Sequence, residues 1–265
     1  MKFCFANDIA VNYSISGADK CRHIVFINSL GTDLRIWDDV VTDLSKDYRC
    51  LCYDKRGHGL SGGEEEAYSI DLLTKDLFEL LNAVSWKDDL ILVGLSVGGL
   101  IAQNFAYHHP EKVAGLVLMD TAAKIGDDKS WNQRIAIIRE RGIPAVGKNI
   151  MTRWLTHDFK QKRPDAYACY RNMLERTSSK AYCATCFALR DSDLTSQTAE
   201  LKLPTLVIVG ENDLSTPPQL VKQTADLIAN ADYQTIATCG HLPCIEQPEL
   251  TIKALRSFIS EKLHG

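Results

Sequence analysis

A serine lies between glycines at the end of an apolar run, in the stretch LVGLSVGGL at residues 92–100. The pattern G-x-S-x-G presents a nucleophile when it forms a sharp turn between a strand and a helix, and its glycines leave room for that turn. Such a pattern also arises by chance, with the serine only a small polar residue in a turn, so the context decides. Here DLILVG predicts a buried strand before the pattern, and a helix-length amphipathic segment follows it. The context therefore predicts that Ser96 is a nucleophile.

A serine hydroxyl needs a base to remove its proton, and the base needs an acid to orient it. On this type of turn the chain order is serine, acid, histidine. His241, in ATCGHLPCIEQP after the strand-like DYQTIA, is the histidine in the right place, and a surface-loop histidine is the alternative. Asp213 follows the strand-like PTLVIVG and is the favoured acid. Asp120, which ends VAGLVLMD, is the second candidate, and Glu211 is a weaker one.

Acyl transfer also requires donors for the negative charge that develops on the carbonyl oxygen. One donor is expected to be the backbone amide of Val97, the residue after the serine. The other should come from the loop NSLGTDLRIW, where the register points to the amide of Leu30. Because backbone groups donate, the side chains at these two positions are only required not to be proline.

Short apolar segments separated by helix-length segments are expected to position these residues. Strands alternating with helices predict a mostly parallel, doubly wound sheet. KFCFA and AVNYSIS near the N-terminus have no helix between them and predict an antiparallel hairpin at one edge. Residues 123–198 are polar and helical in pattern. They are interpreted as an inserted helical lid on a core of residues 1–122 and 199–265.

Composition limits the function classes. The 265 residues carry a formal net charge of −4 without long basic runs, which argues against partners such as nucleic acid or an acidic membrane surface. The N-terminus has no apolar stretch of signal-peptide length, so a cytoplasmic location is expected. Cys183 and Cys186 form a lone C-x-x-C, which without a second pair favours free thiols over zinc binding. Cys244 is expected to pack in the core.

Four motifs occur in the order typical of the α/β-hydrolase superfamily, which the chain resembles over its whole length: YDKRGHGLS, GLSVGG, GENDLSTP and GHLPCIEQPE. More narrowly, NSLGTDLRIWD, LVLMDTAAKIG and WNQRI resemble the 3-oxoadipate enol-lactonases of aromatic-compound breakdown. Many relatives have His-Gly where this chain has Asn28 and Ser29, and the NSLG form matches the lactonase subgroup. The resemblance implies hydrolysis of a five-membered enol-lactone with an acetate side chain, without cofactor or metal.

A carboxylate-bearing substrate favours an arginine in an otherwise apolar pocket, because the guanidinium can hold a carboxylate with two parallel hydrogen bonds. The lid offers Trp131 with Arg134 and Arg153 with Trp154, and Trp37 is a further pocket candidate near the oxyanion loop. An arginine on a lid helix is often merely solvated, which is the alternative for Arg134.

Other functions of the same fold remain open. A general carboxylesterase or a carbon–carbon bond hydrolase would use the same triad, and a non-catalytic ligand-binding protein would not need all three residues. Asp54 and Arg56 of YDKRGHGLS are interpreted as turn-stabilising residues. The sequence leaves a homo-oligomer open.

Overall fold

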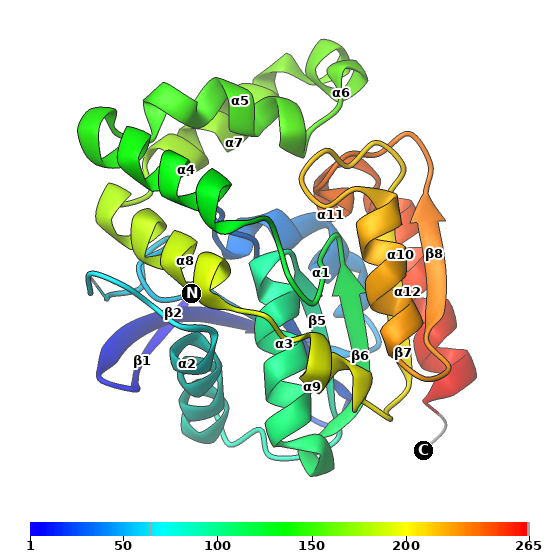
Figure 1. Cartoon of the computed structure of the whole chain (residues 1–265). Coiled ribbons are helices and arrows are strands. Elements are labelled where there is room, and N and C mark those ends of the chain that lie inside the picture. The colour runs from blue at the N-terminus through cyan, green and yellow to red at the C-terminus, as the bar shows by residue number, and fades with distance from the viewer. Residues whose placement is uncertain (64, 264–265) are drawn as a thin grey trace.

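The computed structural model describes residues 1–63 and 65–263. An eight-stranded sheet in the order β1-β2-β4-β3-β5-β6-β7-β8 runs through it, with helices on both faces (Figure 1). The strands are β1 (Lys2–Ala6), β2 (Ile9–Ser16), β3 (His23–Ile27), β4 (Arg49–Tyr53), β5 (Leu90–Leu95), β6 (Val113–Met119), β7 (Thr205–Gly210) and β8 (Asp232–Ile236).

The pairing confirms the predicted mixture of parallel and antiparallel strands. β1 and β2 form the expected hairpin, with Lys2 opposite Tyr13 and Ala6 opposite Ile9, and β2 continues antiparallel to β4. All pairs from β4 to β8 are parallel. Every residue of β5 and β7 is buried, as expected for central parallel strands that are covered by helices on both faces.

Two groups of helices cover the sheet. On one face α1 packs against α12, and on the other α2 contacts α3, α3 contacts α9, and α9 contacts α10. The helices of the core are α1 (Asp38–Leu44), α2 (Ile70–Ala83), α3 (Val97–His108), α9 (Thr195–Ala199), α10 (Pro218–Leu227), α11 (Pro243–Glu246) and α12 (Pro248–Lys262), with short 3-10 helices η1 (Leu34–Trp37) and η2 (Pro110–Lys112).

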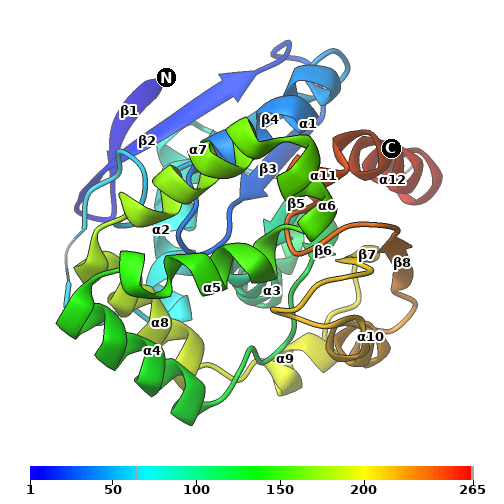
Figure 2. The same cartoon turned by 90° about the horizontal axis from the view of Figure 1, so that it is seen from above.

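The segment between β6 and β7 rises above the sheet as a layer of helices (Figure 1). Seen from above, this layer lies across the carboxyl ends of the central strands (Figure 2). Its helices are α4 (Asp128–Arg141), α5 (Pro144–Trp154), α6 (His157–Lys162), α7 (Pro164–Glu175) and α8 (Ser179–Asp191). The end of the insertion returns to the core, where Thr198 Oγ1 donates to Gln103 Oε1 of α3 at 2.7 Å.

Two further features bear on the sequence expectations. All nine cysteines are free thiols, and Cys183, Cys186 and Cys244 are buried, the first two on α8 and the third on α11. Within residues 1–63 and 65–263, none of the helices has the length and apolar character that a membrane span requires.

Candidate active site

Ser96 lies on a strained turn between β5 and α3. Its backbone has φ 57° and ψ −120°, a conformation that is costly for a residue with a side chain and that clusters at functional sites. The turn is held by Ser96 N–H, which donates to Met119 O at 3.0 Å, and by Thr121 Oγ1, which donates to Ser96 O at 2.7 Å. A Cβ at Gly98 would lie 2.1 Å from the carbonyl oxygen of Ile27, so the glycine is required.

His241 and Asp213 meet where the sequence order predicts. Both are buried, and Nδ1 of His241 lies 2.8 Å from Oδ2 of Asp213. An ionised carboxylate can only accept, so this contact places the imidazole proton on Nδ1 and leaves Nε2 as a proton acceptor. The pair has the geometry of a catalytic base and the acid that orients it.

The carboxylate of Asp213 is held by several donors besides His241. Ser215 N–H donates to Oδ1 at 2.7 Å, and Thr216 donates to Oδ1 from its amide at 3.1 Å and to Oδ2 from its hydroxyl at 2.7 Å. Burial opposes ionisation, but the charge of His241 and these hydrogen bonds outweigh it and hold the pKa of Asp213 below its ordinary value. Asp213 is therefore ionised at neutral pH.

A half-buried glutamate braces the His241 loop against the lid. Glu246 Oε2 accepts from Gly240 N–H at 2.9 Å, while its Oε1 accepts from the amide of Thr156 at 3.1 Å and from the hydroxyl of the same residue. The amide of His241 donates to Trp154 O at 2.9 Å. We did not predict a role for Glu246, and its position five residues after His241 is the only sequence signal.

Ser96 and His241 open onto a cavity of about 100 Å³ between the sheet and the lid. Of the residues expected to touch substrate, Trp131, Arg134 and Trp154 line this cavity, as does Arg153. Leu30 lines it as well, from the loop after β3. The other lining residues come from the loops of the core and from the lid segment: Ser29, Ser215 and Thr216 from the loops, and Ile125, Gly126, Ser130 and Leu189 from the lid segment.

The two arginines of the cavity differ in how they are held. Arg134 is half-buried, and its guanidinium lies 4.9 Å from the ring centre of Trp131. The indole N–H of Trp131 donates in turn to Ile125 O at 2.7 Å, which fixes the ring. Arg153 is exposed. Arg134 is thus the cation with a defined position.

Trp37 does not lie at this cavity. It is completely buried beneath the oxyanion loop and packs on Phe26, with ring centres 5.0 Å apart. Its indole N–H has no hydrogen-bond partner among the described residues. The expectation that Trp37 contacts substrate is not supported, because η1 directs its side chain into the core rather than toward the lid.

The loop that should supply the second oxyanion donor is held from below by two buried residues that we did not predict. Lys55 Nζ donates to Ser29 O at 2.8 Å, and burial lowers the pKa of Lys55 to about 7. His58 Nε2 accepts from Gly31 N–H at 3.1 Å, and its Nδ1 lies 3.0 Å from Arg56 O. Both lie in YDKRGHGLS, where we expected only turn-stabilising roles.

Asp54 and Arg56 have the expected stabilising contacts. Asp54 accepts from the amides of Leu34 and Leu60, both at 2.8 Å, and so ties the oxyanion loop to its own turn. Arg56 donates to both carboxylate oxygens of Asp76, at 2.8 and 2.6 Å, in a buried ion pair.

The two other acid candidates occupy different surroundings. Glu211 accepts from Thr238 N–H at 3.0 Å on the surface. Asp120 is completely buried beside Asp213 and His241. One of its carboxylate oxygens lies within 4.8 Å of a carboxylate oxygen of Asp213 and of a ring nitrogen of His241. His241 is hydrogen-bonded to Asp213, which favours Asp213 over Asp120 as the candidate acid.

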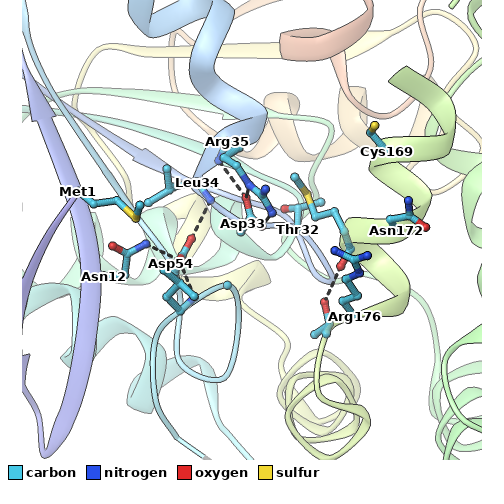
Figure 3. Close-up of a pocket in the computed structure, with 14 residues that line it drawn as sticks. Met1, Asn12, Thr32, Asp33, Leu34, Arg35, Asp54, Cys169, Asn172 and Arg176 are labelled. Atoms are coloured by element: carbon cyan, nitrogen blue, oxygen red, sulfur yellow. Dashed lines mark hydrogen bonds and ion pairs between the residues drawn. The ribbon is translucent and has the colours of Figure 1, made fainter. Parts of the chain in front are cut away.

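A separate cavity of about 470 Å³ lies on the other side of the oxyanion loop, between that loop and α7 (Figure 3). The two acidic side chains that line it already have protein partners. Asp33 pairs with Arg35 at 2.6 Å, and Asp54 accepts from the amide of Leu34. This cavity shares no lining residue with the one that contains Ser96 and His241. Because Ser96 and His241 line it, the smaller cavity is the candidate active site.

Comparisons with known proteins agree with this geometry. Residues 22–248 match the family described as alpha/beta hydrolase fold. The 3-oxoadipate enol-lactonase 2 of Acinetobacter baylyi is 32% identical over 244 residues, which cover 92% of this chain and 91% of the relative. The 2-hydroxy-6-oxo-6-(2'-aminophenyl)hexa-2,4-dienoic acid hydrolase of Metapseudomonas resinovorans is 26% identical over 269 residues, 98% of this chain and 91% of the relative.

The crystal structure of the enol-lactonase from Burkholderia xenovorans LB400 superposes with a TM-score of 0.95 at 32% identity, and the match covers 98% of this chain and 100% of that chain. The resemblance inferred from the motifs is therefore confirmed. With the strained serine turn, the buried Asp213 and His241 pair and the helical layer above them, the chain belongs to the α/β-hydrolase fold family.

Proposed function

We propose that this protein is a serine hydrolase that opens the ring of 3-oxoadipate enol-lactone and releases 3-oxoadipate. The observation that carries the proposal is that one cavity brings together Ser96, His241 and the fixed cation Arg134. The similarity to enol-lactonases over more than nine-tenths of the chain supports the choice of substrate.

In this reaction Ser96 Oγ attacks the lactone carbonyl while His241 Nε2 takes its proton. The carbonyl oxygen becomes negatively charged and accepts hydrogen bonds from the backbone amides of Val97 and Leu30. Val97 is the first residue of α3, so its amide has no partner within the helix. In the Leu30 loop, the Gly31 amide donates to His58 Nε2 and the Thr32 amide donates to Ser29 O. The Leu30 amide is therefore the one left to donate to substrate.

The ring opens when the carbon–oxygen bond to the enol breaks and His241 returns the proton to the enol oxygen. The released enol can tautomerise to a ketone, which draws ring opening forward. Water, activated by the same histidine, then attacks the acyl-enzyme and releases the second carboxylate with Ser96 restored.

The acetate carboxylate of the substrate would pair with Arg134. Its stacking on Trp131 holds the guanidinium before substrate arrives, so less side-chain entropy is lost on binding. Exposed Arg153 is a weaker candidate because no such packing fixes it.

Steady-state kinetics on a substrate panel tests the proposal. The panel is the enol-lactone, p-nitrophenyl acetate and a vinylogous diketone, with 3-oxoadipate identified by mass spectrometry. We expect the highest kcat/KM on the enol-lactone, at or above about 10⁴ M⁻¹s⁻¹. A preference for the p-nitrophenyl ester would instead indicate a general carboxylesterase.

A carbon–carbon bond hydrolase is the second candidate, which the 26% identity to the dienoic acid hydrolase favours. Turnover of the vinylogous diketone with little turnover of the lactone would establish it. A protein that binds lactone but never reacts at Ser96 with a fluorophosphonate would be a non-catalytic binding protein.

A further inference from the structure

Asp120 is a buried carboxyl group that the mechanism above does not use. It follows β6, it is completely buried, and its Oδ1 accepts from Gly210 N–H at 2.8 Å. Its Oδ2 has no donor partner among the described residues. A carboxylate oxygen of Asp120 lies within 4.8 Å of a carboxylate oxygen of Asp213. Two carboxyl groups buried this close together repel each other when both are ionised, which favours a proton on one of them.

The donors around the pair decide which carboxyl group carries that proton. Asp213 accepts from the amides of Ser215 and Thr216, from the Thr216 hydroxyl and from His241. Asp120 accepts only from Gly210. Donors stabilise the ionised form of an acid, and like charges in close contact inside a protein disfavour double ionisation. The negative charge therefore belongs on Asp213 and the proton on Asp120.

We propose that Asp120 is protonated and donates a hydrogen bond to Asp213, which makes it a positioning residue that sets the orientation and basicity of the Asp213 and His241 pair. This third carboxyl group keeps the negative charge of the site on Asp213. It also accepts from Gly210 with its other oxygen, so it joins the end of β7 to the acid that follows that strand.

The other titratable groups around Asp120 are consistent with this assignment. They come from the loop after β8 and from α11: Cys239, His241, Cys244 and Glu246. Burial raises the pKa values of the Cys239 and Cys244 thiols, so both are neutral at pH 7. Burial likewise raises the pKa of Asp120 well above its ordinary value, and the charges of Asp213 and Glu246 raise it further.

Asp120→Asn is the informative variant because an amide keeps both contacts: it can accept from Gly210 and donate to Asp213 without a charge. If Asp120 is neutral in the wild type, the substitution removes no charge. We expect kcat/KM to stay within about threefold, and the acid limb of its pH profile, which reports protonation of the His241 base, to stay within about 0.3 pH unit. Loss of a negative charge next to His241 would move that limb to lower pH by about one unit or more, which would overturn the proposal.

Infrared difference spectroscopy reads the proton directly and does not depend on the substrate. Wild type minus Asp120→Asn at pH 7 should show the carbonyl stretch of a protonated carboxylic acid, shifted in D₂O. A lost carboxylate band in its place would refute the assignment. Glu211→Gln, which replaces an exposed carboxylate in the Asp213 loop, is the control and should lose only a carboxylate band.

A second variant, Asp120→Leu, removes the donor. If it folds, the loss of that donor makes Asp213 more basic, so the acid limb should move to higher pH; an unchanged limb would contradict a role for the hydrogen bond. The kinetic arm can use p-nitrophenyl acetate or whichever panel substrate the wild type turns over. Failure of the lactone assignment would thus leave the test of Asp120 intact.

Discussion

The triad and the substrate-facing lid differ in how their side chains are held. Asp213 and His241 are both buried and follow adjacent parallel strands; backbone amides fix Asp213, and Asp213 in turn fixes the His241 ring. Arg134 and Arg153 lie on lid helices, half-buried and exposed, and only Arg134 is held by packing. The candidate triad is thus positioned at the ends of the strands, whereas the candidate substrate-binding residues lie on lid helices. The lid also supports the triad, because the His241 amide donates to Trp154 O. Each substitution below tests one side of this difference.

Removal of the nucleophile should have the largest effect. Ser96→Ala is expected to lower kcat by about 10⁴-fold or more, because proton transfer and acyl transfer both pass through its hydroxyl. The thermal midpoint of unfolding should change little. Ser260→Ala on the exposed face of α12 is the matched control and should keep full activity and fluorophosphonate labelling. Labelling of Ser96→Ala at the wild-type rate would place the nucleophile elsewhere.

Asp213→Asn should rank second. The neutral amide cannot hold the Nδ1 tautomer of His241, so kcat should fall by about 10³ to 10⁴-fold in the same kinetic assay. Glu211→Gln in the same loop should stay within about threefold of wild type, since Glu211 contacts only Thr238 N–H on the surface. Near-normal turnover by Asp213→Asn would transfer the acid role to Asp120 or Glu211.

Arg134→Ala tests the lid side of the comparison. Loss of a charge-assisted contact to the substrate carboxylate should raise KM for the acidic lactone by about 10 to 50-fold, with kcat less affected. Neutral esters should keep their KM. Arg153→Ala is the matched control on the same cavity and should have the smaller effect. Equal losses on acidic and neutral substrates would show that Arg134 supports the fold of the lid rather than binding substrate.

Lys55→Met tests the support under the oxyanion loop and should have the smallest effect. The pKa of Lys55 is about 7 when folded and about 10.5 ordinarily. Between these values the unfolded chain binds a proton that the folded protein does not, so this group makes stability rise with pH above about 7.

Urea unfolding at pH 7.0 and 8.5 should therefore show a smaller gain in the free energy of unfolding for Lys55→Met than for wild type, by about 1 kcal/mol. Thiols of the unfolded chain begin to ionise toward pH 8.5, but they do so equally in the variant and the wild type, so the difference between the two slopes still reports Lys55. Lys46→Met, at an exposed position, should keep the wild-type slope. Identical slopes for Lys55→Met and wild type would contradict the buried, neutral state of Lys55.

The sequence was sufficient to predict the strands and the order of the triad. Apolar segments such as PTLVIVG can only be buried strands, and G-x-S-x-G acquires its meaning from the strand before it and the helix after it. Ser96, Asp213 and His241 each follow a strand, and parallel strands bring their carboxyl ends to one edge. The approach of these three residues therefore follows from the parallel order of the strands, which the hydrophobic pattern of the sequence predicts.

Side-chain direction in the loops could not be predicted in the same way. Trp37 was expected in the pocket from its nearness to the oxyanion loop, but a 3-10 helix turns it into the core against Phe26. The supports from Lys55 and Glu246 are long-range contacts to other segments, and no local pattern signals them. The proximity of Asp120 to Asp213 depends on β6 and β7 being neighbours, which the alternation of strands and helices does not determine.

The most direct test of the central claim, that the triad opens a lactone whose carboxylate the lid recognises, is the kcat/KM of the wild type for 3-oxoadipate enol-lactone and for its neutral methyl ester. The two share the ring and the scissile bond, so the triad treats them alike. We expect the acid to be favoured by about 10-fold or more, mainly through KM, as one charge-assisted contact would give. Equal or better turnover of the neutral ester would contradict the account.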